Sequence, residues 1–372
     1  MRIAMLGSRG IPAQYSGIEA SLQEVCPRLV QRGHRVSVYC AARTSPTTGM
    51  YKGVLLRRLP AIYTKHLETA TRTLLSTLAE VIGDNDILHF HALGPSFLSF
   101  LPRFAGKGTV ATIHGLDWRH AKWGTAARAV LRACEWGAVR FPNVTIVVSK
   151  SLVDYVRDRH GRSVVYIPNG VTIRPPENRR LLASLDLQNA PYILFVTRLI
   201  PGKGLDCLIR AFSGMETNHR LVLVGDAAYD RPYVEHLRQL AAENPRVMFP
   251  GFVTGRLLEE LFSNAALYVF PSETEGLSIS LLEAMGYGQC VLASDIPPNR
   301  EVLSDKGFYF APGDVEELKR SMTRLLSDAE LRQRKGQEAR EHVSKHYNWD
   351  TIVDRIEQLY TDVLKRRGKC PA

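Results

Sequence analysis

The sequence predicts an α/β protein with two Rossmann-like domains whose parallel sheets face each other across a cleft. Three observations lead to this prediction. The chain has 372 residues, which is enough for two domains that each bury a core. Short runs rich in Val, Ile and Leu recur without polar alternation, as in strands buried on both faces. Helical stretches separate most of these runs, which indicates parallel strands joined by helical crossovers.

The first group of elements occupies residues 1–172. A helix is expected at 19–32, and helical stretches at 65–82 and 124–140. Residues 174–190 are polar and Pro-rich, which predicts a linker to a second domain. The strands expected in the first domain are "RIAMLG" (2–7), "RVSVYC" (35–40), "DILHFHA" (86–92), "GTVATIHG" (108–115) and "VTIVVS" (144–149).

The pattern then restarts, and a second domain is expected at residues 190–347. Residues 348–372 follow it, with Ile352, Ile356, Leu359 and Val363 forming a helical stripe. We expect part of this last helix to cross back to the first domain. The six strands expected in the second domain are "YILFVTRL" (192–199), "HRLVLVGD" (219–226), "RVMFPGFV" (246–253), "LYVFPSE" (267–273), "CVLASD" (290–295) and "GFYFAPGD" (307–314).

Composition is that of a soluble globular protein, with 45% apolar and 23% charged residues, and no apolar run is long enough to span a bilayer. The six cysteines contain no CxxC pair, which favours a reducing cytoplasm and argues against a zinc site. The net charge of +11 is uneven, because residues 1–172 hold 22 Lys and Arg against 10 Asp and Glu. This basic half suggests an anionic partner such as membrane lipid or pyrophosphate, or simply a solubilising surface. No nucleic-acid recognition module appears, so no nucleic-acid partner is expected.

The loop "TRLIPGKG", residues 197–204, follows the first strand of the second domain, where ligands bind in open α/β sheets. Arg198 and Lys203 are cations on either side of a Pro-Gly turn. A guanidinium and an ammonium can together neutralise a diphosphate. The alternative is an ordinary solvated turn.

The stretch "ETEGLSISLLEAM", residues 273–285, places two carboxylates around a glycine turn before a helix. Gly276, after Glu275, lets the backbone approach a ligand closely. The N–H groups near Leu277 and Ser278 are expected to face phosphate at the helix start. Glu283 lies inside the helix, where a carboxylate that accepts two sugar hydroxyls would be satisfied; a salt bridge or a solvated face is the alternative.

The first domain offers histidines at strand ends. His114 follows a strand and points toward the expected cleft, or it is a structural hydrogen bonder. Asp117, three residues later, binds sugar or acceptor, or caps a helix. His89 and His91 alternate along a strand end; they lack an evident third ligand, so they are interpreted as cleft-lining or structural and no catalytic metal is expected.

A dinucleotide site is not indicated, because the glycines at 7, 10 and 17 do not keep G-x-G-x-x-G spacing. The Asp-x-Asp of residues 84–86 precedes a strand and is interpreted as a turn.

Taken together, "TRLIPGKG" and the Glu275–Glu283 pair resemble the Arg/Lys and E-x7-E signature of retaining glycosyltransferases of the GT-B fold, family GT4. The resemblance extends over essentially the whole chain, through "VLVGD", "FPGFV", "FAPGD" and "HYNW". It implies that Arg198 and Lys203 bind the donor diphosphate, that Glu283 binds the ribose hydroxyls and that Glu275 binds those of the transferred sugar. The backbone around Phe252 and Val253 would contact the base.

The first half, with "GSRGIPAQYSGIEASLQEVC" and "HGLDWRHAKWG", resembles a GT4 subgroup that includes β-1,4-rhamnosyltransferases. These enzymes transfer rhamnose from dTDP-rhamnose to a lipid-pyrophosphate-linked sugar. This chain has Tyr15-Ser16-Gly17-Ile18-Glu19 where they have Tyr-Gly-Gly-Phe-Glu. The resemblance implies an acceptor-binding first domain and a nucleotide-sugar-binding second domain. Donor contacts are expected at Gly17 and His114, and acceptor contacts are expected at Tyr15, Asp117, Trp118 and Lys122.

The sequence thus predicts a metal-independent, cofactor-free glycosyltransferase. His114, Glu275, Arg198 and Lys203 would carry the transfer of a sugar, with retention, to a lipid-linked or saccharide acceptor in surface polysaccharide synthesis. The first choice of donor is dTDP-rhamnose, and mannosyl, galactosyl or N-acetylglucosaminyl transfer from GDP- or UDP-sugars is the alternative. A sugar phosphorylase and a non-catalytic nucleotide-sugar-binding protein are the alternatives of other classes.

The expected location is the cytoplasm, with peripheral attachment at the inner face of the cell membrane. Residues 65–82 and 124–140 are basic-half helices with tryptophans nearby, and they are the expected contacts with anionic lipid. The alternative is that both are ordinary core helices with a solvated basic face.

Overall fold

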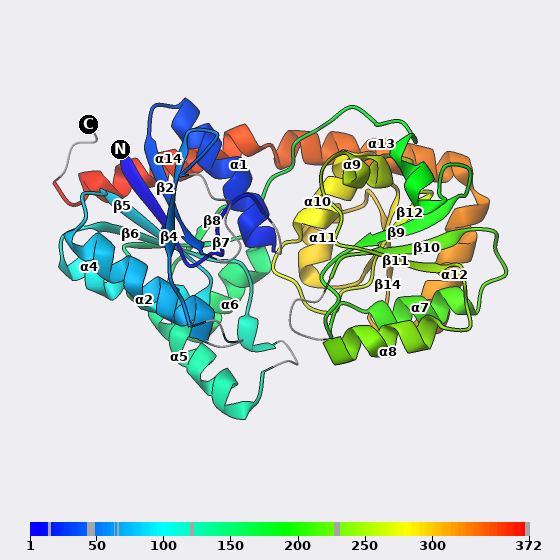
Figure 1. Cartoon of the computed structure of the whole chain (residues 1–372), viewed down its shortest axis with the longest axis horizontal. Coiled ribbons are helices and arrows are strands. Elements are labelled where there is room, and N and C mark those ends of the chain that lie inside the picture. Colours follow the sequence, from blue (N-terminus) through cyan, green and yellow to red (C-terminus); the bar gives the residue numbers. More distant parts are fainter. Residues whose placement is uncertain are drawn as a thin grey trace. The chain divides into compact units, whose positions relative to one another are not determined.

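The computed structural model describes residues 1–13, 16–42, 49–62, 64, 67–119, 123–226 and 231–368 (Figure 1). The chain divides into two compact units. Unit 1 comprises Met1–Gly170 and Trp349–Ala372, and unit 2 comprises Val171–Asn348. Each unit contains one large, mainly parallel sheet with helices between its strands, so the predicted α/β class is confirmed.

Unit 1 is built on an eight-stranded sheet with the strand order β3-β4-β2-β1-β5-β6-β7-β8. All neighbouring strands run parallel except β3, which pairs antiparallel with β4. Every residue of β5 and β6 is buried, as expected for strands covered on both faces. The strands are β1 (Arg2–Leu6), β2 (Arg35–Ala41), β3 (Met50–Tyr51), β4 (Val54–Leu59), β5 (Ile87–His91), β6 (Gly108–Ile113), β7 (Val144–Val147) and β8 (Val165–Tyr166).

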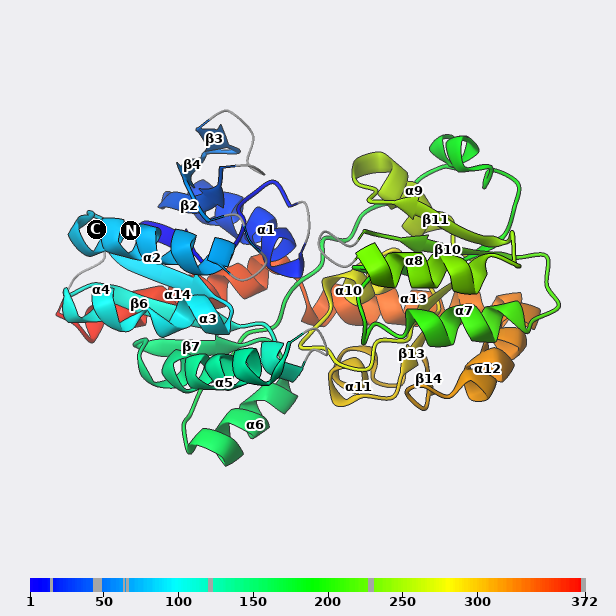
Figure 2. The same cartoon turned by 60° about the horizontal axis from the view of Figure 1, so that its bottom comes forward.

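Helices cover both faces of this sheet. The side chains of β1 alternate between two cores: Ile3 and Met5 belong to the larger one, and Ala4 and Leu6 belong to a smaller one on the opposite face. Figure 2 shows α2, α4 and α5 together on one side of the sheet. The helices are α1 (Gly17–Gln31), α2 (Leu67–Ile82), α3 (Leu93–Phe97), α4 (Phe100–Phe104), η1 (Asp117–Arg119), α5 (Thr125–Arg140), α6 (Lys150–His160) and α14 (Trp349–Lys365).

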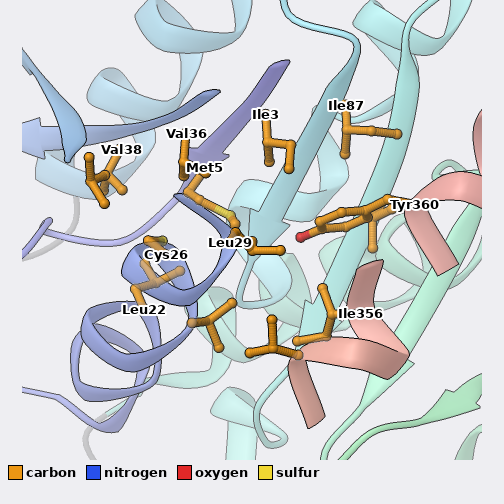
Figure 3. Close-up of a cluster of buried hydrophobic side chains, with 14 of the residues drawn as sticks. Ile3, Met5, Leu22, Cys26, Leu29, Val36, Val38, Ile87, Ile356 and Tyr360 are labelled. Atoms are coloured by element: carbon orange, nitrogen blue, oxygen red, sulfur yellow. The ribbon is translucent and has the colours of Figure 1, made fainter. Parts of the chain in front are cut away.

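The larger core of unit 1 lies between the sheet, α1 and the C-terminal helix α14. Figure 3 shows Leu22 and Leu29 of α1 and Ile356 and Tyr360 of α14 in one cluster with side chains of the strands. The stripe predicted from the sequence is buried here, since Ile352, Ile356, Leu359 and Val363 are all at most 8% exposed. The last helix of the chain therefore packs within unit 1 rather than on unit 2.

Unit 2 contains a six-stranded, wholly parallel sheet with the order β11-β10-β9-β12-β13-β14. Figure 1 shows α7 and α8 on one side of it and α13 on the other. The strands are β9 (Tyr192–Val196), β10 (Arg220–Val224), β11 (Val247–Gly251), β12 (Leu267–Phe270), β13 (Val291–Ser294) and β14 (Phe308–Phe310). The helices are η2 (Leu181–Leu185), α7 (Leu205–Ser213), α8 (Arg231–Ala241), α9 (Gly255–Asn264), α10 (Ile279–Gly286), α11 (Pro297–Leu303), α12 (Val315–Ser327) and α13 (Ala329–His346).

Two parts of the fold differ from the prediction. The hairpin of β3 and β4 and the short strand β8 were not predicted. Residues 174–190 are not a plain linker, because they contain η2, and Leu182 and Leu187 are fully buried. The carboxylate of Glu260 accepts hydrogen bonds from the backbone N–H groups of Leu181 (2.7 Å) and Leu182 (3.2 Å), which anchors this segment to α9. Among the described residues, no helix is both long and apolar enough to cross a membrane.

Candidate functional site

The chemistry-bearing loops of unit 2 meet at its topological switch point, the place where the strand order reverses direction. β9 pairs with β10 on one side and with β12 on the other. The loop 197–204 follows β9, and the loop that carries Glu275 follows β12. Because carboxyl ends of parallel strands lie at one edge, these two loops are neighbours at the position where open α/β sheets bind ligands.

Lys203 and Glu275 form an ion pair at this edge. The Nζ of Lys203 donates to Oε1 of Glu275 at 2.5 Å, and both side chains are only 11% exposed. The two loops also touch through their backbones, because the N–H of Glu273 donates to the carbonyl of Gly202 at 3.1 Å. A Cβ at Gly204, where φ is +68°, would lie 2.2 Å from the carbonyl oxygen of Pro271, so this close approach requires glycine. The structure therefore brings together two residues that lie 72 positions apart in sequence.

Arg198 lies in the same loop but is exposed. Its backbone is held near the end of β10, because the N–H of Leu199 donates to the carbonyl of Asp226 at 3.2 Å. A Cβ at Gly225, where φ is +143°, would lie 1.7 Å from the carbonyl oxygen of Thr197. The guanidinium thus projects from a fixed backbone at the carboxyl edge.

The helix α10 begins at the end of the Glu275 loop. Ser278 is its N-cap, and its hydroxyl accepts a hydrogen bond from the N–H of Leu281 at 3.4 Å. Gly276 and Leu277 are buried in the approach to the helix. Glu283 is half-buried on the second turn. The N-terminus of α10 adds positive backbone potential to the edge that already holds Lys203.

Phe252 and Val253 follow β11, the edge strand, which β10 separates from β9. The side chain of Phe252 is 52% exposed, and that of Val253 is half-buried. These two residues therefore lie at the same edge of the sheet as Lys203, but two strands away from the ion pair.

In unit 1, His114 directly follows β6 and is half-buried. Its Nε2 is 3.1 Å from Nδ1 of His91, which ends the neighbouring strand β5. Burial lowers the pKa of His114 to about 4 and holds the pKa of His91 well below its ordinary value. Both imidazoles are therefore neutral at physiological pH.

His89 has a structural role. One ring nitrogen is 2.6 Å from the hydroxyl of Tyr360 and the other is 2.7 Å from Oγ1 of Thr112, so His89 links α14 to two strands. A cavity of about 30 Å³ lies beside these residues, with His89, His91, Thr112 and His114 among its lining side chains. Among the described residues, no group of three or more His, Cys, Asp or Glu side chains is placed to hold a metal ion.

Asp117 and Trp118 lie in the short helix η1, and both are half-buried. The indole N–H of Trp118 donates to Oε2 of Glu135 at 2.6 Å. The guanidinium of Arg132 lies over the Trp118 ring, 4.6 Å from its centroid. The indole N–H is thus already used inside the protein, and only the ring of Trp118 is available to a ligand.

Glu135 was not among the residues that the sequence singled out. Its buried carboxylate accepts from Trp118, from the hydroxyl of Tyr155 (3.0 Å) and pairs with Nε2 of His160 (2.6 Å). It therefore fixes η1 relative to α5 and α6. No local motif marks it, because its partners come from two other segments, η1 and α6.

Gly17 is the first residue of α1, which Ser16 caps by accepting from the N–H of Glu19 at 3.4 Å. Gly17 is exposed at this helix start. Tyr15 and Lys122, the two remaining predicted acceptor contacts, lie outside the described residues.

Two families match the two parts of the chain. Residues 15–174 match Glycosyltransferase Family 4, and residues 179–342 match Glycosyl transferases group 1. A glycosyltransferase of Methanocaldococcus jannaschii that is described as uncharacterized is 26% identical, over 99% of this chain and 100% of that protein. The GDP-mannose-dependent alpha-(1-6)-phosphatidylinositol monomannoside mannosyltransferase of Mycobacterium tuberculosis is 27% identical, over 96% of this chain and 97% of the relative.

Solved structures share the fold. The sucrose-phosphate synthase from Thermosynechococcus elongatus superimposes with a TM-score of 0.87 at 21% identity, over 98% of this chain and 99% of that one. HepE of Anabaena, solved in complex with UDP and glucose, gives a TM-score of 0.83 at 21% identity, over 97% of this chain and 100% of that one. These likenesses confirm the GT-B fold that the sequence predicted.

Proposed function

We propose that this chain, whose residues 15–174 match Glycosyltransferase Family 4 and whose residues 179–342 match Glycosyl transferases group 1, is a glycosyltransferase that moves a sugar from a nucleotide-sugar donor to a lipid-linked or saccharide acceptor. Support comes from the relatives, one of which is GDP-mannose-dependent by name, and from the UDP and glucose bound to HepE. Our first choice of donor is dTDP-rhamnose, in surface polysaccharide synthesis, because the first half resembles rhamnosyltransferases. GDP-mannose and UDP-hexoses are the alternatives.

The observation that carries the proposal is the buried Lys203–Glu275 pair at the switch point of unit 2. Removing one partner of such a pair leaves an uncompensated charge, which destabilises a protein by about 3–5 kcal/mol. Each residue of the pair therefore depends on the other, and together they join the two loops at the carboxyl edge of the sheet. A donor diphosphate would attract the Lys203 ammonium, and the Glu275 carboxylate would accept the hydroxyls of the transferred sugar.

The resemblance to retaining GT4 enzymes leads us to propose the following transfer step. The acceptor oxygen bonds to the anomeric carbon while the bond from that carbon to the diphosphate oxygen breaks. The acceptor oxygen approaches from the face of the sugar that the diphosphate leaves. The acceptor proton can therefore pass to the leaving diphosphate, and the configuration is retained. Arg198, Lys203 and the N-terminus of α10 stabilise the departing charge, which a divalent metal would otherwise do.

Unit 1 supplies the acceptor contacts and two of the donor contacts in this proposal. His114 contacts the transferred sugar near the reacting carbon, and Asp117 accepts from an acceptor hydroxyl. Trp118 offers its ring face, because its indole N–H is held by Glu135. Tyr15 and Lys122 complete the acceptor contacts, and Gly17 at the start of α1 allows the donor to approach the backbone.

In unit 2 the base would contact the backbone of Phe252 and Val253, and Glu283 would accept from the ribose hydroxyls. Gly276, Leu277 and Ser278 would present backbone N–H groups to the diphosphate. These assignments fit a donor that lies along the carboxyl edge, from the end of β11 to the start of α10.

We also propose a peripheral contact between unit 1 and anionic membrane at the inner face of the cell membrane. α2 contacts α4, α3 contacts α5, and Figure 2 shows α2, α4 and α5 on one side of the sheet. Arg132 on α5 is exposed, as are Val130 and Trp136 of the same helix. Such a surface gains apolar burial and attraction for anionic lipid. Its exposed large apolar residues are Leu67, Leu74, Leu75, Leu78 and Ile82 on α2, Phe104 on α4, and Val130 and Trp136 on α5.

Vesicle sedimentation tests the membrane contact. The full-length protein should sediment with phosphatidylglycerol vesicles and much less with phosphatidylcholine vesicles. Replacing Leu78 and Ile82 together with serine should reduce sedimentation at least threefold. Equal partition of the wild-type protein and the double variant would contradict the proposal.

A donor panel tests the catalytic proposal. Release of nucleoside diphosphate is measured from dTDP-rhamnose, GDP-mannose, UDP-glucose and UDP-N-acetylglucosamine, with and without a lipid-pyrophosphate-linked N-acetylglucosamine acceptor. Turnover of dTDP-rhamnose that depends on the acceptor supports the first choice. Preference for a GDP- or UDP-sugar keeps the site assignment and changes the donor. Release of sugar 1-phosphate with free phosphate, or binding of every donor without turnover, would refute the proposed reaction.

A further inference from the structure

His91 contacts the one histidine of unit 1 that the proposed function places at the reacting sugar. It is the last residue of β5, and His114 follows the adjacent strand β6. The Nδ1 of His91 is 3.1 Å from Nε2 of His114, and the two ring centroids are 5.4 Å apart. From the sequence, His91 was interpreted only as a cleft-lining or structural residue.

The other ring nitrogen of His91 is an unpartnered buried atom. His91 is 4% exposed, and within the described part of the chain its Nε2 has no hydrogen-bond partner. Most buried polar atoms in native proteins are satisfied, so an exception requires an explanation. Here the unpartnered Nε2 indicates which ring nitrogen of His91 carries the proton.

Two arrangements are possible for the bond between the rings. Since burial keeps both imidazoles neutral, one N–H is shared between Nδ1 of His91 and Nε2 of His114. If His114 donates, His91 must carry its own proton on Nε2, which is a buried N–H without an acceptor. If His91 donates, its Nε2 is only an unused lone pair. Orphaned buried N–H groups are the rarer case, so the second arrangement is favoured.

The ring of His91 is also held in place. It lies against the ring of His89, with centroids 4.3 Å apart and planes tilted by 30°, and His89 is hydrogen-bonded at both ring nitrogens. The next residue, Ala92, has φ of +71°, which is rare for a residue other than glycine and is typical of functional sites. A Cβ at Gly7 would lie 2.5 Å from the carbonyl oxygen of His91, so the glycine loop after β1 packs directly against this backbone. His91 therefore cannot easily turn its ring to satisfy Nε2.

We propose that His91 is a positioning residue: its Nδ1–H donates to Nε2 of His114 and thereby keeps the proton of His114 on Nδ1. In a neutral imidazole the partner of one nitrogen sets the state of the other. His114 then presents an uncharged donor, at Nδ1, to an oxygen of the transferred sugar. This last step depends on the proposed function, whereas the tautomer itself does not.

The tautomer can be measured without substrate. Full-length protein carrying ¹⁵N-labelled histidine rings gives two-bond ¹H–¹⁵N spectra that distinguish a protonated ring nitrogen from a bare one, and the His91→Leu and His114→Gln variants assign the signals. In the wild-type protein Nε2 of His114 should be bare and Nδ1 protonated. A protonated Nε2 on His114 in the wild-type protein would overturn the proposal, whatever the variants do.

The variants test the direction of the bond. In His91→Leu the donor is lost, and the signals of His114 should shift toward the tautomer protonated on Nε2. In His91→Asn the amide NH₂ lies near the former Nδ1 position and should keep His114 protonated on Nδ1. An unchanged His114 in the leucine variant would contradict the proposal. His346→Leu, on an exposed position of α13, is the matched control and should leave the His114 signals unchanged.

Kinetics then separate this inference from the proposed function. His91→Leu should lower kcat about tenfold with less than a threefold change in the KM of the donor, and His91→Asn should recover most of the loss. If His114 carries its proton on Nδ1 but the wild-type protein turns over no donor, the proposed function fails. The hydrogen bond by which His91 sets the tautomer of His114 is then confirmed, without a role in sugar transfer. If turnover occurs and His91→Leu matches the wild-type kcat, the positioning role is wrong and the proposed function stands.

Discussion

Acid should destabilise unit 1 through histidines that fold in their neutral form. Burial lowers the pKa of His89 to about 3 and the pKa of His114 to about 4, from an ordinary value of 6.5. Between pH 6.5 and these native values the unfolded chain binds a proton at each histidine that the native chain does not bind. Stability therefore falls as the pH falls below 6.5, and the loss stops growing below the native pKa of each histidine.

The magnitude follows from these two pKa values. Each pH unit in this window removes about 1.4 kcal/mol per histidine from the free energy of unfolding. At pH 5 the two histidines together should remove roughly 4 kcal/mol. That is a large part of the ~5–15 kcal/mol by which native domains are stable. The His89→Gln substitution removes the share of His89, about 2 kcal/mol at pH 5, while His91, whose pKa burial also holds well below its ordinary value, loses stability in both proteins.

Tryptophan fluorescence is a selective assay for this effect. Urea unfolding followed by fluorescence at pH 7, 6 and 5 would report on unit 1, and His346→Gln in the exposed part of α13 is the control. If His89→Gln loses as much stability between pH 7 and pH 5 as the wild-type protein, the reasoning about His89 is wrong. The four tryptophans of the sequence all belong to unit 1: Trp118, Trp123, Trp136 and Trp349.

Two further substitutions test the packing around the site. Gly225→Ala places a Cβ 1.7 Å from the carbonyl oxygen of Thr197 and should lower the urea midpoint of unit 2, measured by circular dichroism. The control is Gly214→Ala, whose Cβ meets only the flexible side chain of Lys319 and should leave the midpoint unchanged. Equal midpoints for the two variants would contradict the close approach at Gly225. Trp118→Phe leaves the Glu135 carboxylate without one of its hydrogen-bond donors and should destabilise unit 1 by about 1–3 kcal/mol in the same urea assay. A change under about 0.5 kcal/mol would show that the hydrogen bond from Trp118 to Glu135 does not hold η1.

The sequence predicted the buried strands well, because each is a continuous apolar run with one dominant pattern. All six strands of unit 2 were expected, as were five of the eight strands of unit 1. The strand β4 was not predicted because its burial alternates along the chain, which is typical of a strand near a sheet edge. The segment with η2 resembled a linker because its composition is polar, and the apolar anchors Leu182 and Leu187 are only two residues among many polar ones.

The sequence predicted which loops carry the residues of the candidate site, but it did not predict which of these residues contact each other. The sequence placed Arg198 and Lys203 in one loop and Glu275 in another, each after a strand, and the strand order of unit 2 brings these two loops together. It did not predict that Lys203 contacts Glu275, since only the pairing of β9 with β12 determines this. The bond between His91 and His114 was missed for the same reason, because it depends on the pairing of β5 with β6.

The most direct test of the central claim is turnover of the nucleotide-sugar donor by Glu275→Gln. Glutamine keeps the size of the side chain but removes the charge that would accept sugar hydroxyls. Loss of two charge-assisted hydrogen bonds of about 1.5 kcal/mol each should lower kcat about 100-fold, with nucleoside diphosphate still bound. Glu273→Gln, an exposed position of the same loop, should stay within about twofold of the wild-type kcat. Turnover by Glu275→Gln within about threefold of the wild-type rate would contradict the assignment of Glu275 to the transferred sugar.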